Sequence, residues 1–352
     1  MLMQMYEYTW TRVQAFRPSP IREKYREIWN KIRMDTIRLD QICAVHRGLW
    51  TGALHIFIVD RDKIDFYQME TDPLKPALRG KDIKPFGYIW REFYVIYAAR
   101  EFFPDFDDRF PNIMKWLERH RLVLERRSAV FTWGRKWWEL EDPLHPAVFE
   151  TPKILSPLFA RFQSFALDVS GTYYVLDSSI IIRRWTNYRE QRLYVENWKR
   201  VNEPHIDVDK FIGEGDEAWK NLGSGTDALW YILALLNSEV LEFFFKMYTP
   251  RLAKRSRHPK KGRWYSYMPP HLNILPIKVA ELNTIRDITR RSKEIHDKTM
   301  TYLRLSEGDA EKTYMGADIE FMKTELNEII FDIYDLNEKE KIIIQNFVYR
   351  KR

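Results

Sequence analysis

The sequence predicts an α+β fold, in which a mixed β-sheet domain lies between helical N- and C-terminal flanks. Apolar residues recur at helical spacing in residues 21–40 and again through most of residues 279–352. Between these flanks, β-branched and aromatic residues alternate around turn-forming glycines and prolines. The chain has 352 residues, of which 45% are hydrophobic and 15% aromatic. It is therefore long enough to bury a sizeable core in two or three structural units.

The N-terminal elements follow from these patterns. Residues 21–40 alternate charged and apolar positions and predict an amphipathic helix. From Ile42 the pattern predicts a strand, a tight turn over residues 49–52 and a second strand. The segment PALRGKDIKPF (residues 76–86) predicts a loop, and WREFYVIYA (residues 90–98) the next strand.

Helix and strand patterns alternate in the middle of the chain. FPNIMKWLERHRLVLERR predicts a helix whose first turn holds Pro111. Residues 152–184 predict strands with a turn at Ser170 and Gly171, which places Tyr173 and Tyr174 on opposite faces, one in the core and one exposed. Residues 185–225 are polar and predict a surface insertion that contributes no core.

The C-terminal part predicts mainly helices. Residues 227–248 are apolar on most sides and predict one buried helix that begins at Asp227. Asn337 and Glu340 have the spacing of a capping box for the last helix. We therefore divide the chain into an N-terminal helical segment (1–40), a mixed-sheet domain (41–278, with the insertion at 185–225) and a C-terminal helical region (279–352).

Charge and cysteine content narrow the functional classes. The net charge of +7 favours acidic partners. The single cysteine, Cys43, excludes an internal disulfide framework and a cysteine-based zinc site, and we expect it to be buried. The sequence starts without a signal-peptide pattern and has no apolar run of about 18 residues. We therefore expect a cytoplasmic protein that does not bind membranes.

The basic excess is concentrated in one stretch. Lys246 to Arg263 contains eight lysines or arginines and no acidic residue, and Trp264, Tyr265 and Tyr267 follow it. Phosphate backbones bind such a surface through counterion release, and aromatic rings beside it stack on bases. This stretch predicts a nucleic-acid partner. A solvated basic loop without a function is the alternative.

Motifs for catalysis are weak. The sequence contains no glycine-rich phosphate or dinucleotide loop, no HExxH and no Gly-x-Ser-x-Gly motif. Glu150 and Lys153 resemble part of the acidic-plus-lysine pattern of metal-dependent nucleases, and Asp105, Asp107 and Asp108 add carboxylates without a lysine. We expect no catalytic residue and no metal ligand. The alternatives are a metal-dependent DNA nuclease and a helical scaffold subunit with an incidental basic loop.

Several segments in order carry a family resemblance. They are HRGLWTGALHIFIV, PLKPALRGKDIKPF, FPNIMKWLERHRLVLERR, FETPKILSP, FALDVSGTYYVLDSSIIIR, LWYILALLNSEVLEFFFK and the basic stretch that ends in NILPI. Together, over roughly residues 40–345, they resemble the TaqI-like C-terminal specificity domain of Type IIG restriction-modification enzymes and adenine-specific DNA methyltransferases. The resemblance implies a target-recognition domain that binds double-stranded DNA.

The resemblance also implies where the DNA contacts lie. In RGKDIKPF, Gly80 would let the backbone approach a phosphate. In the basic stretch, arginines are candidates for reading guanine, and lysines suit phosphates. The predicted DNA-binding residues are Arg79, Lys81, Lys84, Tyr173, Arg251, Lys254, Arg255, Arg257, Lys260, Lys261, Arg263, Trp264 and Tyr265.

The sequence departs from the family in one respect. A full enzyme of this kind carries an Asn/Asp-Pro-Pro-Tyr/Phe tetrapeptide and an S-adenosylmethionine loop, whereas the only Pro-Pro pair here, Pro269-Pro270, follows Met268. We therefore expect no methylation by this chain alone and no cofactor in it. S-adenosylmethionine is expected only in a partner or a missing domain. As part of a longer enzyme, the chain would belong to a site-specific DNA adenine-N6 methyltransferase or a Type IIG restriction enzyme.

Overall fold

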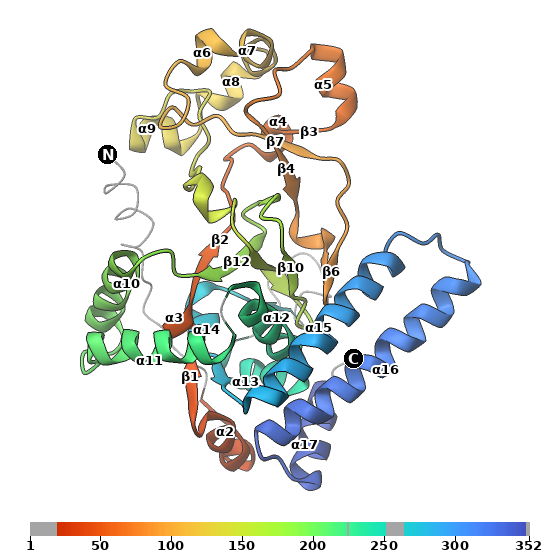
Figure 1. Ribbon diagram of the computed structural model, residues 1–352. Helices are drawn as coiled ribbons and strands as arrows, with labels where there is room; N and C mark the ends of the chain where they lie inside the picture. Colours follow the sequence, from red (N-terminus) through yellow and green to blue (C-terminus); the bar gives the residue numbers. More distant parts are fainter. Residues whose placement is uncertain (1–19, 224, 251–263, 350–352) are drawn as a thin grey trace.

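The computed structural model describes residues 20–223, 225–250 and 264–349. The fold is α+β, with 53% helix and 16% strand, which confirms the predicted fold class. Figure 1 shows a sheet in the middle of the molecule, a lobe of short helices above it, and longer helices below and to one side. The central sheet therefore separates two hydrophobic cores.

The central sheet has four antiparallel strands in the order β10-β8-β12-β2. Its strands are β2 (Cys43–Arg47), β8 (Lys153–Pro157), β10 (Ala166–Asp168) and β12 (Ser179–Arg184). Side chains alternate across the sheet. Ile180 and Ile182 therefore belong to the core on the side of the longer helices, the lower core, while Ile181 belongs to the core on the side of the short helices, the upper core. Both faces are covered, which explains the continuous apolar run in SIIIRR.

A second sheet with the order β11-β4-β7-β3 supports the upper lobe. Its strands are β3 (Ile58–Val59), β4 (Leu74–Leu78), β7 (Tyr94–Ile96) and β11 (Tyr174–Val175), with β11 and β4 parallel. Short helices complete the lobe: α4 (Leu54–Phe57), α5 (Arg61–Tyr67), α6 (Phe106–Arg109), α7 (Pro111–Glu118), α8 (Arg121–Leu124) and α9 (Ser128–Trp133). Pro111 begins α7, as predicted.

Three two-stranded ladders complete the β-structure, of which β5–β6 is a local hairpin and the other two join distant parts of the chain. They are β1 (Thr36–Arg38) with β14 (Pro276–Lys278), β5 (Ile83–Lys84) with β6 (Gly87–Tyr88), and β9 (Phe159–Ala160) with β13 (Tyr265–Ser266). Three short 3₁₀ helices accompany them: η1 (Glu23–Tyr25), η2 (Gly80–Asp82) and η3 (Pro146–Val148).

Helices form the lower core. They are α2 (Arg26–Arg33), α3 (Leu39–Ile42), α12 (Gly225–Leu236), α13 (Glu239–Tyr248), α14 (Pro269–Asn273), α15 (Leu282–Tyr302), α16 (Ala310–Ile333) and α17 (Glu338–Tyr349). α15 packs against α12 and α16, and α17 against α13. Within the described ranges, no helix alone has the length and apolarity to cross a bilayer; only α12 and α13 counted together do, across a 65° bend.

The N-terminal prediction was partly wrong. α2 ends at Arg33 instead of continuing to residue 40, because Asp35 adopts a positive φ of 52° and residues 36–38 pair with β14. After the turn at Gly52, the chain forms α4 before the short strand β3. The start of PALRGKDIKPF belongs to β4 rather than to a loop, and Pro76 lies within that strand.

The prediction that residues 185–225 contribute no core was wrong. They form α10 (Tyr188–Val201) and α11 (Val208–Asn221), which bury Trp198 and Phe211 in a third, smaller core. Gly215 lies so close to the α3 segment that an added Cβ would be 2.0 Å from the Gln41 backbone oxygen. Sparse aromatic residues among many charges therefore suffice to bury this helical pair.

The predicted long helix over residues 227–248 is two helices. The break falls at Asn237 and Ser238, where the Asn237 amide bonds to the Phe165 backbone and the Ser238 hydroxyl caps α13. The capping box of the last helix is confirmed, since the Asn337 N–H donates to Glu340 and the Glu340 N–H donates to Asn337.

Candidate nucleic-acid interface

The β5–β6 hairpin is fixed between the central sheet and α15. At its turn, Phe86 has a φ of 61°, and its N–H donates to the Phe165 carbonyl at 2.7 Å. The Phe86 carbonyl oxygen lies 2.7 Å from Nδ1 of His296 on α15. Burial lowers the pKa of His296, which favours the neutral ring. A Cβ on Gly87 would lie 2.8 Å from the Thr299 side chain, so the hairpin packs tightly on this helix.

Asp82 organises the basic residues beside this hairpin. Its carboxylate is 2% exposed and accepts from Arg79 Nε at 3.0 Å and from Arg91 Nε at 3.1 Å. The Arg91 side chain is 55% exposed, so its guanidinium is fixed at the base and open to solvent. Lys81 and Lys84 are exposed, and the Lys84 ammonium donates to the Lys81 carbonyl at 3.0 Å.

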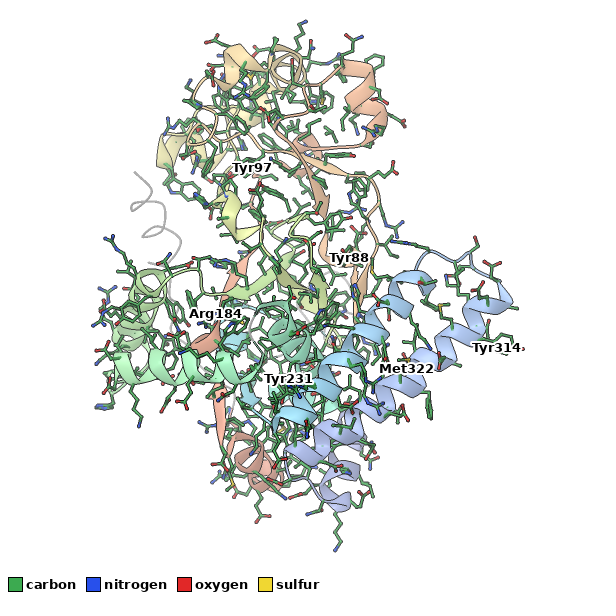
Figure 2. The ribbon with its side chains drawn as sticks, in the orientation of Figure 1. Tyr88, Tyr97, Arg184, Tyr231, Tyr314 and Met322 are labelled. Atoms are coloured by element: carbon green, nitrogen blue, oxygen red, sulfur yellow. The ribbon has the colours of Figure 1, made fainter. Side chains whose placement is uncertain are left out.

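Three half-buried aromatic rings lie next to these cations. The Tyr173 ring centroid is 5.2 Å from that of Tyr88 and 5.8 Å from that of Trp90. Burial raises the pKa of both tyrosines, the Asp168 carboxylate adds to the rise, and the exposed Arg304 opposes it. The phenols are therefore neutral at physiological pH. Figure 2 shows Tyr88 at the junction between the upper lobe and α15.

A buried ion pair positions Tyr173. Asp168 is fully buried, and its carboxylate accepts from the Lys153 ammonium at 2.6 Å, the Ser170 hydroxyl at 3.0 Å and the Tyr173 N–H at 3.0 Å. Gly171 turns the chain with a φ of 64°, where an added Cβ would lie 2.7 Å from the Thr151 nitrogen. The SGTYY turn is thereby fixed from both sides.

The SGTYY turn does not form the hairpin that its sequence indicates. β11 leaves β10 and pairs in parallel with β4. Tyr174 is 1% exposed and belongs to the upper core, while Tyr173 is half-buried. The predicted separation of the two rings holds, but Tyr173 is only partly open to solvent.

We call the resulting site the hairpin surface. It combines exposed cations with half-buried rings, and its members are Lys81, Lys84, Tyr88, Trp90, Arg91, Tyr173 and Arg304. Exposed ammonium and guanidinium groups bind phosphates, and rings held beside them can stack on bases. The buried carboxylates of Asp82 and Asp168 hold the Arg91 guanidinium and the Tyr173 backbone, so these two residues lose less conformational entropy on binding than free side chains would.

Two predicted DNA contacts in the RGKDIKPF segment have structural roles instead. The Arg79 guanidinium lies over the Phe93 ring at 4.1 Å and bonds to Asp82, and its side chain is only 21% exposed. A Cβ on Gly80 would lie 2.3 Å from the Ser178 carbonyl oxygen, and the Gly80 N–H donates to the Ser178 hydroxyl. The close approach that this glycine permits is to protein rather than to a phosphate.

Most of the basic stretch lies outside the described residues. Its members there are Arg251, Lys254, Arg255, Arg257, Lys260, Lys261 and Arg263. Of the residues on either side, Lys246 is buried and ion-paired with Glu242, so it does not belong to a cationic surface. Tyr265 is 2% exposed in the β9–β13 ladder, which makes it a supporting residue rather than a contact. Trp264 is half-buried.

The carboxylates of the nuclease alternative do not converge. Glu150 accepts from the Tyr174 hydroxyl at 2.7 Å, whereas Lys153 pairs with Asp168 inside the sheet. Asp107 pairs with Lys136 in the upper lobe. Within the part of the chain that the structure describes, no group of three or more His, Cys, Asp or Glu residues is arranged to hold a metal ion.

The sequence-based prediction missed four members of the hairpin surface. Tyr88, Trp90 and Arg91 directly follow the RGKDIKPF segment, and their dense aromatic and basic composition was the available signal. Arg304 had no such signal, because only the packing of α15 brings it to this hairpin.

Fold and site together define an α+β protein that presents a rigid, basic and aromatic hairpin. Two curated relatives are similar to part of this chain. The chain is 26% identical over 134 residues to the Type II methyltransferase M.BstVI of Geobacillus stearothermophilus. This match covers 38% of this chain and 23% of that protein. The chain is 31% identical over 117 residues to the Type II methyltransferase M.PaeR7I of Pseudomonas aeruginosa, which covers 33% and 20%. The chain thus matches less than a quarter of the length of either relative.

A solved structure has a similar fold. The Type IIL restriction-modification enzyme MmeI, solved in complex with DNA, superimposes with a TM-score of 0.56 and 10% identity, over 90% of this chain and 36% of that enzyme. No family model matches the chain. Both sequence relatives are Type II methyltransferases, and the likeness to MmeI concerns the fold alone.

Proposed function

We propose that this chain is a sequence-specific DNA target-recognition module of a restriction-modification or DNA adenine methyltransferase system. Catalysis would come from a methyltransferase or restriction domain or subunit outside this chain, which would also bind S-adenosylmethionine. The observation that carries the proposal is the hairpin surface, which presents exposed Lys81, Lys84 and Arg304 together with the packed rings of Tyr88, Trp90 and Tyr173. The relation to Type II methyltransferases supports it.

In this proposal, the cations and the rings have different tasks. Lys81, Lys84 and Arg304 would contact phosphates and set the register of the module on the duplex. Tyr173 and Trp90 would pack against an exposed base or sugar. The basic stretch of residues 251–263 would add further backbone contacts, as its composition predicts. The assignment to the TaqI-like specificity domains, the catalytic partner and the cytoplasmic location are parts of the same proposal.

A salt titration with matched charge variants tests the proposal. The triple variant Lys81→Gln/Lys84→Gln/Arg304→Gln lowers the net charge from +7 by three, to +4. The control Arg200→Gln/Lys210→Gln/Lys220→Gln makes the same change at exposed positions of α10 and α11. Binding to a labelled duplex is measured by fluorescence anisotropy between about 50 and 200 mM salt, the range in which phosphate contacts dominate.

Loss of three phosphate contacts should lower the slope of log K against log salt by about 2.7, and affinity near 100 mM salt by a factor on the order of 10². The control should retain the slope of the unmodified chain. Equal slopes for both triple variants would show that the hairpin surface does not contact DNA. Failure of the unmodified chain to bind any duplex would refute the proposed function itself.

A further inference from the structure

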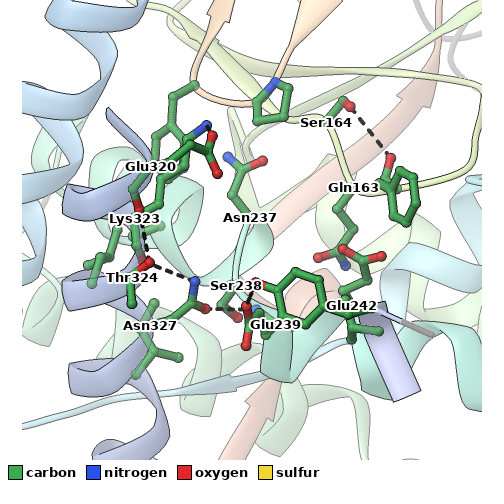
Figure 3. A pocket seen from close by; sticks show the side chains of 18 residues that line it. Gln163, Ser164, Asn237, Ser238, Glu239, Glu242, Glu320, Lys323, Thr324 and Asn327 are labelled. Carbon is green, nitrogen blue, oxygen red and sulfur yellow. Dashed lines mark hydrogen bonds and ion pairs between the residues drawn. The ribbon is translucent and has the colours of Figure 1, made fainter. Parts of the chain in front are cut away.

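A pocket of about 450 Å³ with both polar and apolar lining lies behind the hairpin, between α13, α16 and α17. Pro85 and Phe86 of the hairpin turn line one side of it, and Phe162 lies on the segment after β9. The polar side chains in its lining include Gln163, Asn237, Glu239, Glu242, Thr324 and Asn327. Figure 3 shows that these groups come from several elements and turn toward a common space.

Gln163 is the exception among the amides of this pocket. Its side chain is 4% exposed, and neither its amide nitrogen nor its amide oxygen has a hydrogen-bond partner among the residues that the structure describes. By contrast, Asn237 bonds to both the N–H and the carbonyl of Phe165, and Asn327 bonds to the Glu239 N–H and the Lys323 carbonyl. Among the three amides of this lining, Gln163 is the one with neither its donor nor its acceptor bonded within the described residues.

A buried amide without partners is unfavourable, because folding removes its water without replacing the hydrogen bonds. Figure 3 places the Gln163 amide beside the Glu242 carboxylate, inside the pocket. The Glu242 carboxylate itself pairs with Lys246, and the Glu239 carboxylate accepts from the Tyr349 hydroxyl. A bound molecule that supplies one acceptor and one donor to Gln163 would restore the hydrogen bonds that this amide loses on folding.

The charges of the lining select against anions. Glu239, Glu242 and Glu320 line the pocket, and two of these carboxylates have lysine partners, Lys246 for Glu242 and Lys323 for Glu320. The remaining negative charge disfavours phosphate or carboxylate groups. The rings of Phe86 and Phe162 border the same space and suit a flat molecule.

We propose that this pocket binds a small, neutral, planar molecule that presents a hydrogen-bond donor beside an acceptor, as a primary carboxamide or a free nucleobase does. The Gln163 amide would pair with that edge in a bidentate manner, which is the geometry by which glutamine recognises adenine. The site is separate from the exposed cations of the hairpin surface and does not rest on DNA binding.

Ligand-detected NMR and calorimetry with the full chain test the site in the absence of DNA. Nicotinamide represents the carboxamide edge, adenine and cytosine represent the nucleobase edge, and inorganic phosphate is the anionic counter-probe. We expect saturable binding of nicotinamide or of a nucleobase, and no binding of phosphate. Binding of phosphate alone, or of no probe at millimolar concentration, would overturn the proposal and leave a pocket that holds only water.

Two variants separate a ligand contact from a structural role. Gln163→Met removes the donor and the acceptor at similar volume, and Gln163→Glu keeps the shape while replacing the donor. Both should weaken binding of the probe at least tenfold. Gln163→Met should not lower the melting temperature, because it removes an unpaired buried amide.

The matched control is Gln345→Met on α17, at a half-buried position outside the pocket lining, which should bind like the unmodified chain. Unchanged affinity in both Gln163 variants would exclude the bidentate contact. A large drop in melting temperature for Gln163→Met would show a structural amide instead. None of these readouts depends on the DNA titration, so the two proposals can fail independently.

Discussion

The Lys153–Asp168 pair gives the sharpest test of how the hairpin surface is held. Both side chains are 0% exposed, and their charged atoms are 2.6 Å apart. Besides Asp168, the Lys153 ammonium has the Phe149 carbonyl as its acceptor. Asp168→Asn keeps an oxygen for the SGTYY turn but leaves the Lys153 charge buried without a counter-charge.

The magnitude follows from this geometry. At 2.6 Å and an effective dielectric of about 20, two unit charges attract by about 6 kcal/mol before desolvation is counted. Breaking a buried pair by removing one partner costs about 3–5 kcal/mol. We expect Asp168→Asn to lower the free energy of unfolding by that amount at pH 7. The double variant Lys153→Met/Asp168→Asn should recover at least about 1 kcal/mol, because the unpaired charge is gone.

The pH dependence has a definite sign. Burial lowers the pKa of Lys153 from its ordinary 10.5, and Asp168 opposes this shift. Between the lowered pKa and 10.5, the unfolded chain binds more protons than the folded one, so stability rises with pH. Without Asp168 the pKa falls further and the rise begins at lower pH. The penalty of Asp168→Asn should therefore shrink as pH increases from neutral toward the ordinary lysine pKa.

These quantities are measured by urea unfolding between about pH 7 and about pH 9.5, a range that approaches the ordinary lysine pKa from below. The proteins compared are the unmodified chain, the single variants Asp168→Asn and Lys153→Met, and the double variant. A loss below about 1 kcal/mol for Asp168→Asn, or a double variant no more stable than Asp168→Asn, would refute the reasoning. A penalty that grows with pH would show that the lysine is not the titrating group.

Three further outcomes follow from the structure. Gly215→Ala should destabilise the fold by about 1–3 kcal/mol, because its Cβ would lie 2.0 Å from the Gln41 oxygen. Gly213→Ala in the same helix meets nothing within 4 Å and should stabilise the fold by about 0.5–1 kcal/mol. Thermal unfolding measures both changes, and stability changes of the same sign for the two variants would contradict the prediction. Tyr173→Ala should weaken DNA binding by about 1–3 kcal/mol, whereas Tyr314→Ala on α16, 78% exposed, should have no effect by anisotropy. Burial raises the pKa of the Cys43 thiol to about 12. The thiol should therefore resist alkylation at about pH 8 in the folded chain and react after denaturation. Fast labelling of the folded chain would show that the thiol is accessible.

Local patterns predicted the parts of the fold whose stability is local. The strand that became β12 is rich in isoleucine, Pro111 occupies the first helical position of α7, and Asn337 with Glu340 caps α17. Each of these signals lies within a few residues of the element that it specifies. They therefore appear in the sequence without knowledge of packing.

The errors arose where tertiary contacts override local preference. Asp35 turns the chain out of α2 because β1 pairs with β14, more than two hundred residues away in the sequence, as the Thr36 to Lys278 register shows. α10 and α11 carry many charged residues and are stabilised by a few buried aromatic residues such as Trp198 and Phe211. Neither signal is visible in a short window of sequence.

The candidate site shows the same division. Lys81 and Lys84 were predicted from one segment and are both exposed, Lys81 in η2 and Lys84 in the hairpin that follows it. Tyr173 makes ring contacts with Tyr88 and Trp90 of the same region. The structural roles of Arg79 and Gly80 could not be predicted, because their partners Phe93 and Ser178 come from other segments. The role of Arg304 also depends on the packing of α15.

The anchoring of the β5–β6 hairpin has a consequence for how this surface can diverge. Gly80, Asp82, Phe86 and Gly87 are tied to the scaffold by backbone contacts and buried bonds, while Lys81 and Lys84, placed between them, are exposed. Mutations at the two lysines therefore carry little cost in stability, whereas their neighbours tolerate few changes. Variation would accumulate at the side chains that meet a ligand, so new binding preferences can arise on an unchanged framework.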